Sequence, residues 1–198
     1  MLRKLIALAG FVSIALQAGP PLICHAFEIG TDRSLPWGTS SAAGWDNPDT
    51  GYDVRGLQGD TLSLLNPRTA ILARIETMRR AAIYGIQDPA VVKSLLSSLR
   101  ERTANNTALA LFDYGYMLAT LKQIEWRYKQ DLSGGIDGYA FVKKALALDA
   151  NPEMHFAAAI IASSPPARPA ERAEHLRLAQ AATTDRTLAQ NVLNLFKQ

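Results

Sequence analysis

Two histidines, His155 and His175, are the side chains best suited to move protons or to bind a transition metal near neutral pH. No HExxH or similar metal-binding pair surrounds them. His155 falls beside the apolar positions of its expected helix, which favours a core or helix-end role. His175 comes one helical turn after Glu171, and an exposed i,i+4 pair explains that spacing without catalysis. The histidines therefore predict neither a catalytic site nor a metal site.

Other reaction chemistries find little support in the residue pattern. The sequence has no GxSxG elbow, which a serine hydrolase would place after a strand. Paired carboxylates for glycoside cleavage stay open as an alternative, because their approach is set in three dimensions. The candidates for such a pair are Glu101, Asp113 and Glu125. We predict a protein that is not an enzyme, with no catalytic residues and no cofactor.

A cluster of aspartates could offer oxygen ligands to a hard cation such as calcium. Asp46, Asp49 and Asp53 lie close together in the sequence. However, Pro48 and Thr50 stand where a calcium-binding loop would want acidic or amide ligands, and a glutamate at the twelfth position is missing. Asn-Pro and Asp-Thr-Gly are ordinary turn sequences. The cluster therefore predicts turns and no metal site.

These aspartates belong to a stretch over 27–59 that is rich in glycine and has no helical period, which predicts an irregular arm. The arm carries Trp37, Trp45 and Tyr52, and disordered tails seldom carry such aromatic residues. One interpretation is that the tryptophans pin the arm onto a helical core. The other is that Trp37 and Trp45 form a binding surface that stacks on a sugar or on a protein partner.

The rest of the chain is predicted to be helical, and a long helix over 107–130 is its centre. Apolar side chains recur along it at helical spacing, namely Leu109, Phe112, Tyr116, Met117, Leu121, Ile124 and Tyr128. Further helices are expected over 67–84, from 89, from 137, from 152, over 170–182 and from 184, with a helical turn over 60–65. Their expected caps are Asn66-Pro67, Asp88-Pro89, Thr107, Asp137, Asn151-Pro152 and Thr184.

Two features of these helices predict how they pack. Gly115 lies inside the central helix, where glycine costs about 1 kcal/mol relative to alanine. We expect it to be buried against the helix that carries Ala145, with the two backbones in close approach. The expected helix over 67–84 carries arginines at 68, 74, 79 and 80, which we interpret as a solvated face rather than a surface for an acidic partner.

Part of this region resembles a tetratricopeptide repeat. Lys144–Glu153 is similar to the end of one repeat and the entry into the next, and Gly115 with Leu118 looks like the small-residue position of a first helix. Ala173–Ala179 loosely repeats the theme, so the resemblance covers roughly 107–182. Ala150 stands at the usual proline position, and the spacing does not hold at 34 residues. The resemblance implies a right-handed array of helical hairpins that binds peptides or protein segments.

The first 26 residues read as an export signal. Their parts are the basic start Arg3-Lys4, the apolar run Leu5–Leu16, the break Gly19-Pro20-Pro21 and a small-x-small site, Cys24-His25-Ala26. We predict cleavage near Ala26/Phe27, which would remove the only cysteine. An uncleaved anchor and a lipoprotein site at Leu22-Ile23-Cys24 are the alternatives, although Ile23 is large for the second.

Charge and composition limit the class of partner. Removal of Arg3 and Lys4 from the 21 basic residues leaves 19 against 18 acidic residues, a net charge near +1. No basic stripe is present, so nucleic acid is not an expected partner. The hydrophobic fraction of 48% is ordinary for a globular protein.

Together these patterns predict a signal peptide over 1–26, an irregular arm over 27–59 and an all-α domain of about seven helices over 60–198. We expect a periplasmic or secreted scaffold that binds a protein or peptide and keeps no stable transmembrane anchor after cleavage. Its binding residues are expected to be Tyr114, Trp126, Arg127, Tyr128, Trp37 and Trp45. The alternative function is binding of a polysaccharide or cell-wall fragment through the tryptophans of the arm.

Overall fold

A computed structural model describes residues 21–39, 45–181 and 185–196, and this part of the chain is all-helical, as predicted. The helices are α1 (Leu57–Leu64), α2 (Ile71–Tyr84), α3 (Pro89–Arg102), α4 (Ala108–Tyr128), α5 (Gly138–Leu148), α6 (Pro152–Ala162), α7 (Pro169–Gln180) and α8 (Arg186–Phe196). Short 3-10 turns cover Val54–Gly56 and Thr103–Asn105. None of the described helices is long and apolar enough to cross a membrane.

Most helix starts follow the predicted capping chemistry. The side chains of Asp88, Thr107, Asp137 and Asn151 each accept a backbone N–H from the first turn of the helix that follows. The expected cap Thr184 lies outside the described residues. Next to it, the carboxylate of Asp185 accepts the N–H groups of Thr187 and Leu188 at the start of α8.

The predicted start of α2 at Asn66-Pro67 is wrong. Asn66 instead closes a turn, because its side chain accepts the N–H of Arg68 and its carbonyl accepts that of Thr69. The helix begins at Ile71 without a local side-chain cap. A carboxylate oxygen of Glu153 in α6 accepts the N–H of Leu72 at 3.2 Å. A residue 81 positions away therefore supplies the cap that the local sequence does not.

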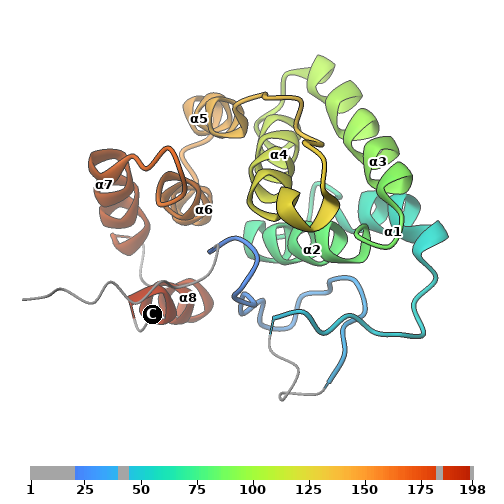
Figure 1. The fold of residues 1–198 in the computed structure, drawn as a ribbon. Coiled ribbons are helices and arrows are strands. Elements are labelled where there is room, and N and C mark those ends of the chain that lie inside the picture. The colour runs from blue at the N-terminus through green and yellow to red at the C-terminus, as the bar shows by residue number, and fades with distance from the viewer. Residues whose placement is uncertain (1–20, 40–44, 182–184, 197–198) are drawn as a thin grey trace, which may run out of the picture.

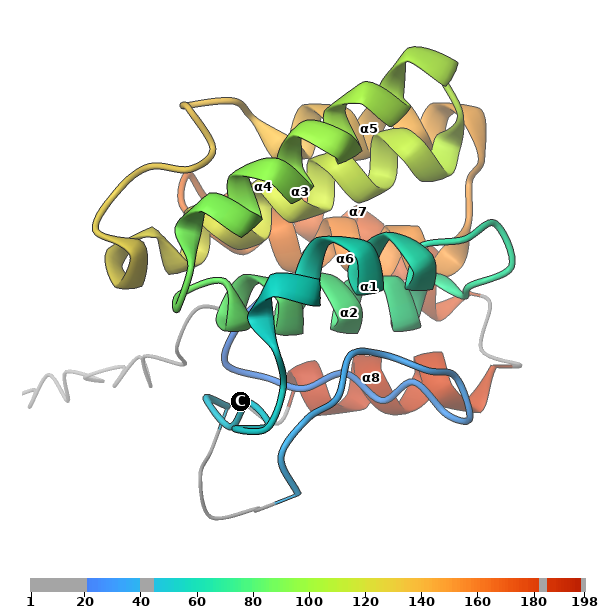
Figure 2. The same ribbon diagram turned by 90° about the vertical axis from the view of Figure 1, so that its right-hand side faces the viewer.

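Helix α2, rather than the long helix α4, occupies the centre of the molecule. Thirteen of its fourteen residues are buried. In Figure 1, α1 and α3 lie to the right of it, α4 above it and α6 to the left, with α5 above α6 and α7 beyond α6. The irregular arm passes below α2 in both views, next to α8 (Figures 1 and 2). Helix α2 is thus enclosed by helices and by the arm.

The arginines of α2 do not form the solvated face that the sequence predicted. Arg74 and Arg79 are buried and Arg80 is largely covered, whereas Arg68 lies outside the helix and is exposed. Arg79 and Arg80 are covered because the arm lies across their side of the helix. Arg74 forms a buried ion pair with Asp113 of α4, with 2.6 Å between Nη1 and Oδ2. The acidic partners of these arginines are therefore internal.

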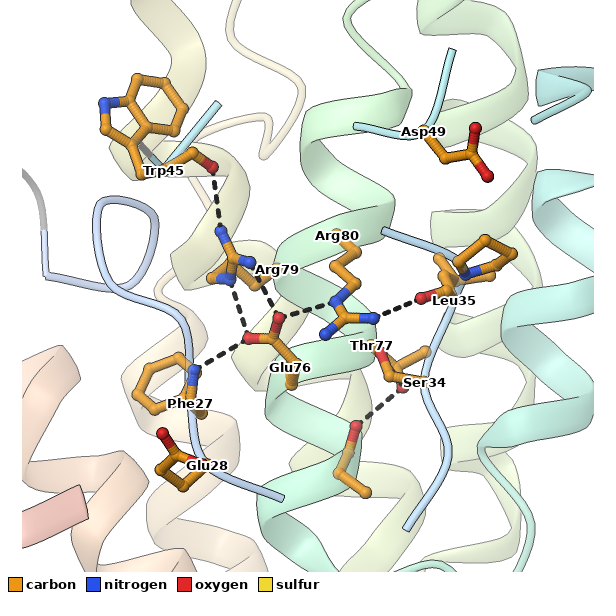
Figure 3. A network of polar contacts seen from close by, with 12 residues as sticks. Phe27, Glu28, Ser34, Leu35, Trp45, Asp49, Glu76, Thr77, Arg79 and Arg80 are labelled. Carbon is orange, nitrogen blue, oxygen red and sulfur yellow. Dashed lines mark hydrogen bonds and ion pairs between the residues drawn. The ribbon is translucent and has the colours of Figure 1, made fainter. Parts of the chain in front are cut away.

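The carboxylate of Glu76 is the centre of a buried polar network under the arm (Figure 3). It accepts two hydrogen bonds from Arg79 at 2.8 Å, one from Arg80 at 2.7 Å and one from the backbone N–H of Phe27 at 3.1 Å. The free ends of the guanidinium groups donate to arm carbonyls, Arg79 to that of Trp45 at 3.3 Å and Arg80 to that of Leu35. The network therefore ties helix and arm together through backbone atoms.

Aromatic residues hold the next part of the arm. The Tyr84 hydroxyl donates to the carbonyl of Pro36 at 2.7 Å and accepts the N–H of Asp49 at 2.9 Å. The ring of Trp37 packs edge-on against Tyr84, and the Arg79 guanidinium lies 4.8 Å from its centroid. Farther towards the N-terminus, the side chain of Asn191 in α8 bonds both backbone groups of Glu28. The arm is irregular in conformation yet fixed at several points.

The close approach predicted for Gly115 is present. A β-carbon built at Gly115 would lie 2.6 Å from the carbonyl oxygen of Gly138 and 3.0 Å from the backbone nitrogen of Val142. Both residues belong to α5, the helix that carries Ala145. Gly138 is the reciprocal position, since a β-carbon there would lie 2.3 Å from the carbonyl oxygen of Gly115. Two glycines therefore allow α4 and α5 to cross with their backbones in contact.

Candidate functional site

The described part of the chain contains a groove of about 740 Å³ beside the α4–α5 crossing. Helix α4 forms one wall, and the end of α6 with the loop that leads into α7 forms the other. Its lining residues are Leu118, Ala119, Lys122, Gln123 and Glu125 on α4, Ile136 and Gly138 before and in α5, Ile161, Ser163, Ser164, Pro165 and Arg168 opposite, and Pro21.

The walls of this groove are built by the packing just described. The Gly115–Gly138 contact draws the start of α5 onto α4, so Gly138 itself lies in the groove. Gln123 bridges to the opposite wall through the Ser164 hydroxyl and accepts the N–H of Leu22 at 2.8 Å. The apolar side chain of Ile136 is 41% exposed in the turn before α5. The groove thus combines a polar side chain that is held by hydrogen bonds, Gln123, with the exposed apolar side chain of Ile136.

Two cations line the groove, and Lys122 is exposed whereas the side chain of Arg168 is only 25% exposed. Lys122 pairs with Glu125 at 2.7 Å, one turn along α4. Arg168 lies 3.4 Å from a carboxylate oxygen of Asp137 and 3.7 Å from one of Glu171, and its guanidinium covers the ring of Tyr139. An exposed pair such as that of Lys122 with Glu125 contributes only about 0–1 kcal/mol. Lys122 can therefore exchange its partner for an incoming anionic group at small cost.

Trp126 extends the same helix face. It follows Lys122 by four residues, which places the two side chains one above the other on α4. Its side chain is 59% exposed, the highest value among the large apolar residues of the described chain. The neighbouring Arg127 lies 5.4 Å from the Trp126 ring and 5.9 Å from the Trp45 ring, and it pairs with Asp46 at 2.8 Å. Three of the predicted binding residues, Trp45, Trp126 and Arg127, therefore do come together.

The other predicted binding residues are placed differently. Tyr114 and Tyr128 are only 3% and 7% exposed, so the expectation that they line a groove is wrong. Tyr114 packs edge-on against Phe141 of α5, and the Tyr128 hydroxyl donates to the carbonyl of Ala82. Both tyrosines lie on the inner side of α4, where the apolar stripe of that helix requires them. Trp37 is half-buried under two arginines, which occupy the ring surface that a sugar would need.

Helices α6 and α7 bring His155 and His175 together, although the sequence predicted separate roles for them. Their Nδ1 atoms are 2.9 Å apart, and Nε2 of His175 lies 2.9 Å from the Tyr139 hydroxyl. One ring must donate and the other accept at this contact, so the two Nδ1 atoms cannot both carry a proton. Burial lowers the pKa of both histidines, and their mutual repulsion lowers that of His175 further. No group of three or more metal-ligating side chains occurs in the described residues.

The carboxylates considered for acid–base chemistry lie apart. Glu125 borders the groove, and Glu101 is exposed on α3. Asp113 lines a different hollow, of about 540 Å³, beside its partner Arg74. Burial raises the pKa of Asp113 to about 6, although Arg74 opposes the shift. The structure therefore brings no two of these three carboxylates to one place.

Sequence reasoning missed the residues that form the groove. Lys122, Ile136 and Arg168 come from three separate segments, and nothing in their local patterns links them. Gly138 is the residue from which this part of the groove could have been predicted. Glycine is a poor helix former, so its position directly after the cap Asp137 indicates that another backbone approaches there.

Comparison of the chain with protein-family models, with curated proteins and with solved structures finds no match.

Proposed function

We propose that this protein is an exported, non-enzymatic helical scaffold, periplasmic or secreted, that binds an extended peptide segment of a partner protein. The observation that carries the proposal is the groove of about 740 Å³ between α4 and the α6–α7 loop, continued by the exposed Trp126. A groove of this size lies in the range that ordinarily holds small ligands or short peptide segments. Exposed tryptophan and arginine side chains are typical of protein-binding surfaces.

The chemistry of the groove favours one kind of peptide. Its walls offer apolar surface from Leu118, Ala119 and Ile161. Lys122 and Arg168 add positive charge, and Lys122, the more exposed of the two, is held by an exposed ion pair with Glu125. A segment with an apolar side chain next to an aspartate or glutamate would fill the walls and take over these cations. The proposed ligand is therefore an acidic, partly apolar peptide.

Helix pairing supports the finer interpretation of a tetratricopeptide-like array. The closest helix–helix contacts are those of α4 with α5 and of α6 with α7, two successive pairs, and α5 also packs on α6. Gly115 stands at the first of these crossings, at the small-residue position that the resemblance implied. In such arrays one face of the stacked pairs binds extended segments. The proposed groove lies between the first pair and the second.

Calorimetric titration with synthetic peptides tests the proposal. One peptide set carries an apolar residue flanked by aspartate or glutamate, and the other replaces these with lysine or arginine. We expect the acidic set to bind preferentially. Lys122→Glu should weaken that binding by about threefold to tenfold, because a lost exposed ion pair and a new repulsion each contribute up to about 1 kcal/mol.

Lys93→Glu is the matched control, since Lys93 is exposed on α3 and lines none of the described hollows near the groove. It makes the same change in net charge and should leave peptide affinity unchanged. Absence of binding by every peptide, or equal loss in both variants, would contradict the proposal. Binding of polysaccharide fragments in place of peptides would favour the alternative function.

A further inference from the structure

The segment from Leu22 to Ala26 lies within the residues that cleavage near Ala26/Phe27 would remove. In the folded protein, however, Leu22 and Ile23 are 0% and 1% exposed and belong to the main hydrophobic core. They are among the largest fully buried side chains of the described chain. A leader that is cut away does not need to fill the core of the protein that remains.

Backbone contacts anchor the same segment. The N–H of Leu22 donates to Oε1 of Gln123 at 2.8 Å, on the floor of the groove. The carbonyl of Ile23 accepts a hydrogen bond from Arg79 at 3.2 Å, beside the Glu76 network. Cleavage after Ala26 would leave the buried Arg79 with one carbonyl fewer, and unpaired buried donors are costly. It would also empty two apolar sites in the core.

We infer that Leu22–Ala26 is an integral part of the folded domain and that the mature protein retains it. Any cleavage of a leader then lies before Leu22. Removal of a leader depends on the proposed export, whereas retention of Leu22–Ala26 in the mature chain does not.

The single cysteine makes this boundary measurable, because Cys24 lies inside the disputed segment. The full gene, with a C-terminal purification tag, is expressed in an exporting bacterium. Thiols in the purified, urea-denatured protein are then counted with a chromogenic disulfide reagent. We expect one thiol per chain and an intact mass that includes Leu22. Cys24→Ser is the control and should give no thiol.

A chain that begins at Phe27 and has no thiol would overturn the inference. So would a chain that begins at a lipid-modified Cys24, because that cleavage also removes Leu22 and Ile23. A full-length chain that begins at Met1 would support retention of the segment while contradicting leader cleavage, so failure of the export proposal and failure of this inference are distinguishable.

A stability measurement tests the same inference independently of processing. Leu22→Ala should lower the melting temperature of the purified protein by about 5–15 °C, which is typical for a leucine removed from a packed core of a chain this size. Leu148→Ala makes the same chemical change at a side chain that is 54% exposed, and it should shift the melting temperature little. Equal, small shifts in the two variants would show that Leu22 does not fill the core.

Discussion

At the scale of single residues, Glu76 holds the arm in place. One buried carboxylate lies between two arginines, which leaves a net positive charge inside the protein. Carbonyl oxygens of the arm at Leu35 and Trp45 solvate that excess charge. The carbonyls of the arm therefore replace water around the two guanidinium groups. The same hydrogen bonds fix the arm on α2.

We predict that Glu76→Gln lowers the free energy of unfolding by about 3–5 kcal/mol, because it leaves two guanidinium groups without a buried counter-charge. Urea unfolding measures the change. Glu125→Gln serves as control, since Glu125 forms an exposed pair with Lys122 and should cost about 0–1 kcal/mol. A Glu76 variant no less stable than this control would show that the network does not hold the arm.

The sequence did contain a sign that these arginines are buried. The large aliphatic residues of α2 form one stripe, but Ala73, Ala81 and Tyr84 lie on its other sides, so apolar residues occur nearly all round the helix. A helix that is apolar all round is normally enclosed by the protein. Glu76 precedes Arg79 and Arg80 by three and four residues, a spacing that allows one carboxylate to pair with both.

At the scale of elements, the α4–α5 crossing depends on the absence of side chains at two positions. Gly115→Ala places a methyl group 2.6 Å from a backbone oxygen of α5, so one of the two helices must shift. We predict a loss of about 1–3 kcal/mol in thermal or urea unfolding. Gly59→Ala is the matched control, because nothing lies within 4 Å of its β-carbon and Gly59 is inside α1.

Gly59→Ala should therefore stabilise the protein by up to about 1 kcal/mol through helix propensity and a less flexible unfolded chain. Opposite signs for the two variants are the expected result. A Gly115→Ala protein more stable than the parent would mean that the two helices separate more easily than their backbone contact indicates.

The contact between α6 and α7 should respond to pH. The pKa of both His155 and His175 is lowered by folding, so each contributes stability that is present above the unfolded pKa of about 6.5. That stability is lost as the pH falls through the lower folded pKa. Protonation of both rings would also set two N–H groups against each other at 2.9 Å.

We expect the melting temperature to fall between pH 7 and pH 5, and His175→Gln to reduce that fall because one of the two titrating rings is gone. Other charges face the pair, namely Glu171, Glu174, Lys143 and Arg168, and they are the same in both proteins. Asp113 acts in the opposite direction, because its raised pKa favours the folded state at low pH. Parallel curves for parent and variant would contradict the assignment.

At the scale of the whole molecule, local chemistry predicted the helices and long-range contacts determined the site. Caps such as Asp88, Thr107 and Asn151 act within three residues, so they can be read from the sequence. The course of the arm depends on partners far along the chain, as with Phe27 and Glu76, which are 49 residues apart. The groove walls likewise come from distant segments, so neither feature leaves a local pattern.

The two hydrogen bonds between the Asn191 side chain and the backbone of Glu28 constrain the order in which the protein can fold. These residues are separated by 163 positions, and Asn191 lies in the final helix. Synthesis and the proposed export both proceed from the N-terminus, so the arm emerges before its last partner. During that interval its apolar residues are available to chaperones and proteases. The interval ends when α8 emerges and Asn191 bonds Glu28. The arm is therefore fully anchored only in a chain that includes this final helix.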